Sequence, residues 1–502
     1  MLNRSSLAAW AGSRRRSAGD GLALAKQAVR NGRPKEAIQA LEKAVALEPE
    51  RREALHELHK LLVVAGRFEE AEPHIAALAR LQPEDAMTWR RLAVCRRTLG
   101  QTVPEAEALG RVIALEPGDE KIPVRLLQLA IAAETDEGSC AVLAALPDSL
   151  VSTDTESNRR SVGLRAVARR LALLGRTEAA RVAWSRLLAW DPTNLEAVTQ
   201  VEEAGLYDAR APRLAPSARP KLLVLGNCQA YGVARRLRLA CPDLEVRTIG
   251  LVEITDAETR AALFARHADA RWIATQPLND SHGPLASAAL EVEGRVVIRF
   301  PRVHFRGLHP DLLRSDVELG GLGLRGYHSA IVLAAYAMDL PQTRAAELFN
   351  AYVYALLGYF DAYPKAEAHL FGEGLRCGMD IESAHAAWMD EGPFMHVPNH
   401  PRPIVLDWLA RKVAERLAVE MRAPDPEPSD IMAPFGSWPV YPEIARRLGL
   451  AGSMTFHPGR GRQALDLEGL LAHGYKTYAR FPRELILGRL GPVVETLRRE
   501  GV

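Results

Sequence analysis

Cysteine is scarce in this sequence, which contains five cysteines among 502 residues. None of the five belongs to a CxxC pair, so neither a zinc ribbon nor a disulfide framework is indicated. A small, odd number of cysteines fits a reducing compartment. We therefore expect a cytoplasmic protein, with a peripheral position at the inner membrane as the alternative.

Long apolar runs and an excess of one charge are also missing. No stretch reaches the roughly 18 uninterrupted apolar residues that indicate a membrane-spanning helix. The 64 basic and 62 acidic residues leave a net charge of +2. Nucleic-acid-binding domains are usually strongly basic, so we expect no nucleic-acid partner. With 48% apolar residues the chain is too hydrophobic to be disordered, and its length predicts more than one domain.

The first half of the chain is repetitive. Pro49, Pro83 and Pro117 end the similar phrases ALEP, RLQP and ALEP, and they lie 34 residues apart. The residues before each proline, and those of a fourth copy at 161–192, match in type and spacing: Leu24, Gly32, Ala37, Leu41 and Ala44; Leu58, Gly66, Ala71, Ile75 and Leu78; Trp89, Leu92, Gly100, Leu109 and Val112; and Leu164, Gly175, Ala180, Trp184 and Leu187. This pattern resembles the tetratricopeptide repeat, whose period is 34 residues.

The spacing of the repeat has a physical explanation. Small residues let two antiparallel helices approach closely, the glycine lies in the turn between them, and the proline cannot continue the second helix. Stacked repeats of this kind form a solenoid with an extended concave binding surface. We expect a protein partner in this groove. The alternative is a spacer that only positions the second domain, for example by forming a homo-oligomer.

Composition marks the boundaries between the parts of the chain. Residues 1–16 carry basic residues around an apolar patch that is too short for a secretory signal, and they are predicted to be a flexible basic arm. The repeat array covers 17–206. Residues 207–220 hold three prolines and no apolar periodicity, which predicts a linker. The second domain then covers 221–502.

The second domain opens with a strand, a short polar turn and a helix, which is the opening unit of an α/β domain. Strands are expected at 221–226, 245–251, 271–275 and 295–300. Helices are expected at 230–240, 257–267, 329–338, 342–357, 384–390, 404–419 and 443–448. The fold class is therefore multidomain, with an N-terminal all-α solenoid and a C-terminal α/β domain that has a short parallel-type sheet and many helices.

The turn after the first strand, Gly226-Asn227-Cys228-Gln229, is the best candidate for chemistry. Cys228 lies at the predicted start of a helix, where backbone N–H groups and the helix dipole favour negative charge. Such a position favours the nucleophilic thiolate form of a cysteine. The same N–H groups, with the side-chain amides of Asn227 or Gln229, are suited to hold an oxyanion. The alternative is that Cys228 is a small buried hydrophobe beside a tight turn.

Histidines collect in the second domain, since eleven of the fourteen lie after residue 220. His396 and His400 have the spacing of a helical metal pair, but Pro398 lies between them and disfavours a helix, so we expect no metal. His309 precedes Asp311 by two residues, and a nearby carboxylate can orient an imidazole as a general base. The alternative for each of these histidines is a satisfied turn or core residue.

Arginines fall near the same irregular segments, at 299, 302, 306 and 325. The charge and fork geometry of Arg299, Arg302, Arg306 and Arg325 suit phosphate groups, whereas the alternative is a solvated basic edge. No GxxxxGK[ST] loop is present and no GxGxxG turn opens the α/β unit. We therefore expect neither a nucleoside triphosphatase of that type nor a dinucleotide-binding domain.

Six pieces of the second half resemble, in order, the WcbI-type family of polysaccharide biosynthesis proteins: LVLGNCQ (223–229), HPD (309–311), YHSAIVLAAY (327–336), LFNAYVYALLGYFDAY (348–363), FMHVPNHPR (394–402) and WPVYPEIARRLGL (438–450). GNCQ and FMHxxNHP are the specific motifs. Members of the family look like coenzyme A-binding acetyltransferases of bacterial capsule and surface-polysaccharide clusters, with a mixed α/β fold. One departure is His304 in PRVHFRG, where an aromatic residue is expected.

The resemblance implies which residues form the site. Cys228, His328 and His400 are the implied catalytic residues, with His328 or His400 as the base. The set expected to bind coenzyme A, to which Arg299 is added for its charge, is Gly226, Asn227, Gln229, Arg299, Ser329, His396 and Asn399. The motif residues are carried over position by position, and their individual roles stay open.

The function implied is that of an O-acetyltransferase. Acetyl-CoA would be the acyl donor, a sugar nucleotide or polysaccharide the acceptor, and the repeats would recruit a protein partner for capsule or surface-polysaccharide synthesis. Two alternatives stay open. One is an esterase or thioesterase with Cys228 as nucleophile and water as acceptor, and the other is a non-catalytic adapter of a glycan-assembly complex.

Overall fold

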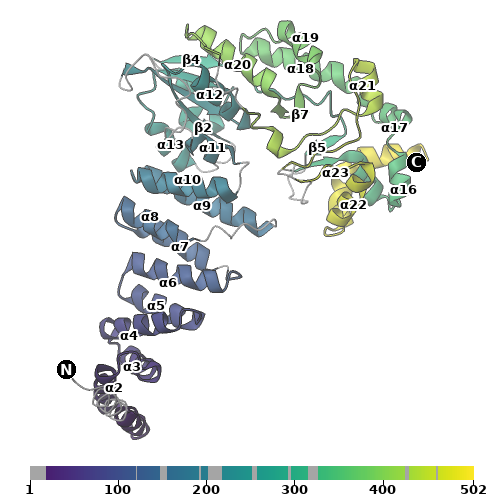
Figure 1. The fold of residues 1–502 in the computed structure, drawn as a ribbon. Helices are drawn as coiled ribbons and strands as arrows, with labels where there is room; N and C mark the ends of the chain where they lie inside the picture. The colour runs from purple at the N-terminus through teal and green to yellow at the C-terminus, as the bar shows by residue number, and fades with distance from the viewer. Residues whose placement is uncertain are drawn as a thin grey trace, which may run out of the picture. The chain divides into compact units, whose positions relative to one another are not determined.

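The computed structural model of the chain forms two compact units, Met1–Asp191 and Pro192–Val502, which are described in turn (Figure 1). The expected arm, most of the expected linker and Arg325 lie outside the described residues. The structure describes residues 19–119, 121–146, 155–190, 194–201, 218–251, 257–291, 295–314, 326–423, 429–459 and 462–501.

The first unit is a stack of antiparallel helix pairs (Figure 1). After a helical stretch at 19–30, its helices are α2 (Pro34–Leu47), α3 (Arg52–Val64), α4 (Phe68–Leu81), α5 (Ala86–Thr98), α6 (Thr102–Leu115), α7 (Lys121–Ala132), α8 (Asp136–Ala144), α9 (Thr155–Leu173) and α10 (Thr177–Trp190). Consecutive helices pack as pairs, α3 on α4, α5 on α6 and α9 on α10. The predicted all-α repeat array is confirmed.

Glycine is needed in the turns of this unit because of the backbone conformation. Gly32, Gly66, Gly100 and Gly175 lie between the two helices of their pairs, with φ between 69° and 75°. An added Cβ would meet no atom within 4 Å at any of the four. Side chains other than glycine rarely adopt this left-handed conformation, so backbone strain and not space fixes the residue type.

The apolar positions of the repeat are buried, except for Leu24 and the half-buried Trp89. Ala37 and Ala71 are fully buried and let the paired helices approach, as the spacing predicts. Leu24, by contrast, is 60% exposed. Leu22 and Ala25 fill the core at that point instead, so the first copy departs from the pattern of the others.

In the third repeat, Glu105 occupies the position that Ala37 and Ala71 hold in the first two. Its side chain is 2% exposed. One carboxylate oxygen accepts hydrogen bonds from Arg97 Nε (2.7 Å) and Arg125 Nε (2.9 Å), and the other accepts from Arg125 Nη2 (2.9 Å). Because a buried charge is tolerated only when it is paired, the two arginines make this substitution possible and link α5, α6 and α7.

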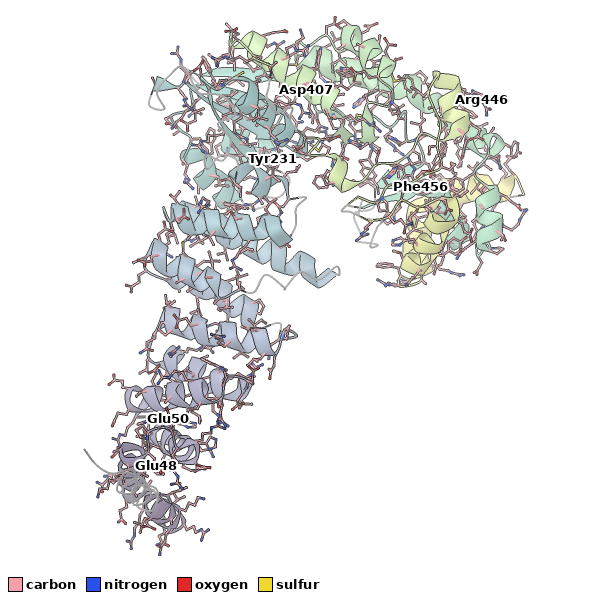
Figure 2. All side chains as sticks on the ribbon, viewed as in Figure 1. Glu48, Glu50, Tyr231, Asp407, Arg446 and Phe456 are labelled. Atoms are coloured by element: carbon pink, nitrogen blue, oxygen red, sulfur yellow. The ribbon has the colours of Figure 1, made fainter. Side chains whose placement is uncertain are left out.

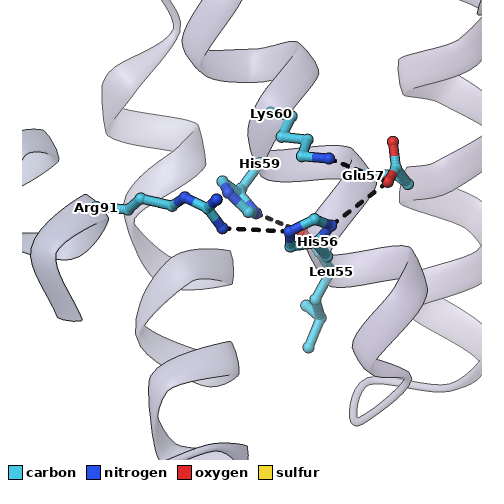
Figure 3. Close-up of polar contacts among 6 residues, drawn as sticks. All are labelled: Leu55, His56, Glu57, His59, Lys60 and Arg91. Carbon is cyan, nitrogen blue, oxygen red and sulfur yellow. Dashed lines mark hydrogen bonds and ion pairs between the residues drawn. The ribbon is translucent and has the colours of Figure 1, made fainter. Parts of the chain in front are cut away.

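A polar cluster on α3 also reaches across to the next repeat (Figure 3). His59 is buried and its Nδ1 contacts the carbonyl oxygen of Leu55 at 3.1 Å. Arg91 from α5 contacts His56 Nε2 at 3.2 Å, and Glu57 contacts both His56 and Lys60. Burial lowers the pKa of His59 to about 4, so this imidazole is neutral near pH 7.

The second unit contains a four-stranded parallel sheet in the order β2-β1-β3-β4. Its strands are β1 (Lys221–Gly226), β2 (Glu245–Gly250), β3 (Trp272–Thr275) and β4 (Val296–Arg299). The register places Val224 beside Thr248 on one side and beside Ala274 on the other. All four expected strands are present within a residue or two, and the expected parallel sheet is confirmed.

Both faces of this sheet are covered, which explains the continuous apolar run of β1. Leu222 and Val224 belong to the larger core, which includes residues of α12 (Cys228–Ala240). Leu223 and Leu225 point to the other face and pack in a smaller core with Leu285. Parallel strands buried on both faces have no polar alternation, so the sequence pattern and the burial agree.

Helices form most of the rest of the second unit (Figure 1). The helices and short strands beside α12 and the sheet are α11 (Leu195–Val201), α13 (Ala257–Ala265), α14 (Ser287–Leu290), β5 (Leu312–Arg314), β6 (Tyr327–Ser329), α15 (Ala330–Ala337), α16 (Gln342–Glu347), α17 (Ala351–Leu356), α18 (Ala362–Arg376), α19 (Glu382–Asp390), β7 (Met395–Val397), β8 (His400–Pro401), α20 (Pro403–Arg416), α21 (Pro442–Leu448), α22 (Leu467–Tyr478) and α23 (Arg483–Arg499). The single helix expected at 342–357 is wrong, because Asn350 starts a second helix by capping α17 with its side chain.

One face of α12 is buried against α20. Arg236 is 2% exposed and forms an ion pair with Asp407. Gly232 lies where a Cβ would come within 2.7 Å of Leu406 Cδ1, so the two helices meet closely there. Figure 2 shows Tyr231 of α12 and Asp407 of α20 in this packed region. The packing fixes α12, and with it the position of Cys228.

Candidate functional site

The turn between β1 and α12 is held by side-chain amides. Asn227 is the N-cap of α12, and its Oδ1 accepts a hydrogen bond from the backbone N–H of Gln229 at 2.9 Å. The backbone N–H of Asn227 donates to Gln276 Oε1 at 2.9 Å. Gly226 is needed because a Cβ there would lie 2.7 Å from the same oxygen of Gln276. Cys228 is thereby fixed as the first residue of the helix.

Gln229 joins the walls of the site and is itself fully buried. Its Nε2 donates to the carbonyl oxygens of Val303 (2.6 Å) and Asn399 (2.9 Å). Its Oε1 accepts from the backbone N–H of Val303 (3.0 Å) and from Gln276 Nε2 (3.2 Å). All these hydrogen-bonding positions of the Gln229 side chain are occupied by protein groups. The side chain therefore positions the loops, whereas the expectation from the sequence is that it binds the ligand.

Cys228 lines a cavity of about 290 Å³, called here the Cys228 cavity. Asn227, Asn399 and His400 line it too, so four of the expected site residues come together. The described residues of its wall are Leu195, Asn227, Cys228, Tyr231, Gly250, Arg302, His304, Arg306, Leu312, Arg314, Tyr327, Asn399, His400 and Phe435. None of these is an aspartate or a glutamate, so the described wall is cationic.

Two imidazoles face the Cys228 cavity. His400 lies on β8, with its ring centroid 4.9 Å from that of Phe435. His304 comes from the extended segment after β4 and is half-buried. Burial, followed by the charges of Arg302 and Arg306, lowers the pKa of His304 to about 4. The ring of His304 is therefore neutral near pH 7.

The segment 302–306 alternates between the cavity and the core. Arg302, His304 and Arg306 line the cavity, while Val303 and Phe305 are fully buried between them. Successive side chains of an extended backbone point to opposite sides, which explains the pattern. This alternation of basic and apolar residues was the sequence signal that could have identified His304 as a site residue.

His328 lies outside the Cys228 cavity. Its neighbour Tyr327 lines the cavity, and the Tyr327 hydroxyl donates to Asn399 Oδ1 at 3.1 Å. His328 points to the opposite side of β6, where its Nδ1 contacts the Tyr478 hydroxyl at 3.1 Å in a separate small cavity. Burial lowers the pKa of His328 to about 4. The expected role of His328 as base at Cys228 has no geometric support.

Three residues of the expected binding set also serve other contacts. The Ser329 hydroxyl caps α15 by accepting from the backbone N–H of Val332 at 3.1 Å. His396 contacts Asp430 at 2.7 Å between Nε2 and Oδ2. Arg299 forms an ion pair with Glu291. These residues hold neighbouring segments in place through their own contacts, and none of the three lines the Cys228 cavity.

The expected pairing of His309 with Asp311 is not formed. Asp311 is fully buried and its carboxylate accepts hydrogen bonds from the hydroxyls of Tyr441 (2.6 Å) and Tyr359 (2.8 Å), and from the backbone N–H of Ile331 (3.0 Å). These bonds connect the loop before β5 to α15, to the turn before α18 and to the start of α21. Asp311 is a structural anchor, and among the described residues we find no group of three or more histidine, cysteine or acidic side chains arranged to hold a metal.

The fold and the site together define a helical repeat region followed by an α/β domain with a thiol-containing, cationic cavity. Residues 221–422 match the family model of the polysaccharide biosynthesis enzyme WcbI, and residues 28–93 match a tetratricopeptide repeat. The chain thus carries a WcbI polysaccharide biosynthesis domain after a tetratricopeptide repeat region, as the sequence resemblance indicated. Phe435, at the cavity wall, comes from outside the matched residues.

Three solved structures that are similar to this chain each cover just over a third of it. A crystal structure of MamA is 14% identical, with 37% of this chain and 79% of that chain covered and a TM-score of 0.19. A MamA from Desulfovibrio magneticus RS-1 is 16% identical, with 36% and 97% covered and a TM-score of 0.21. YrrB, described as a tetratricopeptide protein with an unusual peptide-binding site, is 15% identical, with 36% and 90% covered and a TM-score of 0.22.

Comparison with curated proteins gives no match. The WcbI match implies an enzyme of polysaccharide biosynthesis, and the tetratricopeptide match implies protein–protein interaction at the repeats. In the part of the chain that the structure describes, no helix combines the length and apolar character that crossing a membrane requires.

Proposed function

We propose that the second unit transfers an acyl group, typically acetyl, from coenzyme A to a sugar hydroxyl in capsule or surface-polysaccharide synthesis. The observation that carries this proposal is the Cys228 cavity, where a thiol at a helix N-terminus faces His304, His400 and three arginines. Coenzyme A is anionic, and a cavity of this size and charge suits its thioester end and a phosphate. The WcbI match supports a saccharide as the acceptor.

In the proposed reaction the thioester carbonyl lies against the first turn of α12. A sugar hydroxyl attacks the carbonyl carbon, its proton passes to an imidazole, and the C–S bond breaks as the C–O bond forms. The imidazole then returns the proton to the leaving thiolate of coenzyme A. Helix N-terminal N–H groups stabilise the oxyanion, and removing one such donor costs roughly 10²–10³-fold in rate.

His400 and His304 are the two candidates for the base, because both line the Cys228 cavity. A positioned general base contributes roughly 10²–10⁴-fold to the rate. A covalent route is the variant in which Cys228 accepts the acyl group from coenzyme A and passes it to the sugar hydroxyl. Cys228→Ser separates the two routes, since wild-type turnover by this variant contradicts the covalent one.

The repeats would bring the enzyme to its substrate. A tetratricopeptide region mediates protein–protein interaction, and we propose that its partner belongs to a glycan-assembly complex. A pull-down from cells with the full-length chain and with a chain altered only in the repeats tests this role. Loss of the partner without loss of activity in vitro is the expected result.

The first experiment is a calorimetric titration of the full-length protein with coenzyme A and acetyl-CoA. We expect saturable binding that Arg302→Ala weakens and that Arg266→Ala, at an exposed arginine outside the cavity, leaves unchanged. Absence of binding by folded protein contradicts the proposal.

Activity assays then separate acyl transfer from the two alternative functions. Cleavage of acyl-CoA without any sugar acceptor favours the hydrolase. An unchanged cellular phenotype after Cys228→Ala and His400→Ala favours the adapter.

A further inference from the structure

A second hollow of about 460 Å³ lies beside the Cys228 cavity, against α18, and is called here the α18 cavity. Arg306, His304, Lys365 and His369 bring positive or titratable nitrogen groups to it. Lys365 and His369 are four residues apart on α18, so they lie on the same face of that helix. The described lining includes no aspartate or glutamate.

Lys365 is an exposed ammonium group without an ion-pair partner among the described residues. Lys412 on α20, by contrast, forms an ion pair with Glu415 at 2.7 Å. A cationic hollow without carboxylates raises the local concentration of anions and favours phosphate groups. The chemistry of the rim therefore points to an anionic ligand.

The floor of the α18 cavity is apolar and aromatic. Leu313, Leu357 and Val493 line it beside the buried ring of Tyr359. Ligand sites commonly combine such a floor with a few convergent polar groups, in volumes of roughly 300–1,000 Å³. A ring system next to a phosphate, as in a nucleotide, matches this combination.

The α18 cavity and the Cys228 cavity share a wall. His304 and Arg306 line both of them. Group transfer requires that the reacting atoms of two ligands come into contact. Here the two cationic cavities adjoin at the imidazole of His304. The Cys228 cavity has two further arginines of its own, Arg302 and Arg314, for the phosphates of the acyl carrier.

We propose that the α18 cavity binds the diphosphate and nucleoside portion of a sugar-nucleotide acceptor, with the sugar directed past His304 toward Cys228. This inference rests on the proposed acyl transfer and names the class of its acceptor. The donor and the acceptor then occupy separate cavities, and His304 lies between them. Its imidazole lines both cavities, which places it to contact the sugar hydroxyl.

The test uses the full-length chain and measures binding of UDP, GDP and dTDP by calorimetry, with the free nucleosides as uncharged controls. We expect at least one diphosphate to bind saturably and its affinity to fall with added salt. Lys365→Glu should weaken that binding by at least about fivefold. Lys476→Glu reverses an exposed lysine on α22 outside both cavities and should leave the affinity unchanged.

Titrations with coenzyme A distinguish this inference from the proposed function. We expect Lys365→Glu to keep coenzyme A affinity within twofold and the diphosphate to bind protein already saturated with coenzyme A. If Lys365→Glu weakens coenzyme A, or coenzyme A displaces the diphosphate, the α18 cavity belongs to the acyl carrier and the inference is overturned. Binding of none of the diphosphates overturns it while leaving acyl transfer intact, and failure of coenzyme A to bind removes acyl transfer itself.

Discussion

Tyr327 and His328 are neighbours in β6, and their side chains serve opposite sides of that strand. Tyr327 faces the Cys228 cavity and donates to Asn399, whereas His328 contacts Tyr478 in another cavity. A strand alternates its side chains between two faces. The side chains of these adjacent residues therefore lie on opposite sides of β6. His328 is for this reason removed from the set of candidate bases.

This relationship predicts different effects for the two positions. Tyr327→Phe removes the hydrogen bond to Asn399 and should cost about 1 kcal/mol of stability and weaken coenzyme A binding. His328→Gln should leave coenzyme A affinity unchanged because His328 lies outside the cavity. Calorimetry and thermal unfolding measure both variants, and a large loss of coenzyme A affinity in His328→Gln would contradict the assignment.

Asn227 has a structural role as a helix cap, and the proposed function gives it a chemical role that substitutions can separate from the first. Its Oδ1 caps α12 through the Gln229 N–H, and it lines the Cys228 cavity. Asn227→Ala should lower stability by about 1 kcal/mol, while Asn227→Ser keeps a capping oxygen and should remain near wild-type stability. We expect both variants to lose turnover, because neither retains the amide N–H₂. Normal turnover in Asn227→Ser would show that capping is the only role of Asn227.

Buried neutral histidines predict a loss of stability in acid. Burial lowers the pKa of His59 and His328 to about 4 and that of His309 to about 3. An unfolded histidine titrates near pH 6.5, so between that pH and the folded pKa the unfolded state binds more protons. Stability should therefore fall as pH is lowered from about 6.5 toward 4, by up to about 1.4 kcal/mol per pH unit for each such histidine.

Thermal unfolding of the full-length chain at pH 7, 6, 5 and 4.5 measures this slope. His328→Gln cannot bind the proton and should flatten it. The same substitution at the exposed His369 should leave the slope unchanged. A stability that is constant from pH 7 to 4.5 would contradict the burial of these imidazoles.

Glu105 predicts a stability difference within the repeats. Glu105→Gln removes a buried charge that Arg97 and Arg125 share, and it should destabilise the array by about 1–3 kcal/mol. Glu107→Gln, at a side chain 65% exposed on the same helix, is the matched control and should change little. Urea unfolding followed by circular dichroism measures both variants. Equal stability of the two would show that the Glu105 pairs contribute nothing net.

Much of the fold could be predicted from the sequence because local chemistry controls it. In each repeat the glycine determines the position of the turn and the proline determines the end of the second helix. Each repeat also contacts mainly its neighbouring repeats. The apolar run of β1 required a strand covered on both faces, and all four expected strands of the sheet are present. The prediction of a single helix at 342–357 is wrong at Asn350, because the side chain of this residue caps a new helix and so interrupts the first one.

The candidate site was predictable only in part, because local chemistry determines some of its residues and long-range packing brings the others together. Cys228 and Asn227 belong to one local motif, a strand end followed by a helix N-terminus, and such a motif determines its own geometry. His400 and Asn399 lie some 170 residues further along the chain, and they reach Cys228 through contacts such as the bond from Gln229 to the Asn399 carbonyl.

The sequence by itself determined the repeat array, the parallel sheet and the thiol at the start of α12, since short-range periodicity and backbone preference are sufficient for these. Only the tertiary structure decided which distant residues share a cavity. It buried Gln229 and Asp311 as anchors, turned His328 away and brought His304 and Arg306 to the wall between two hollows. Those outcomes depend on long-range packing, in which the direction of each side chain follows from the elements that meet around it.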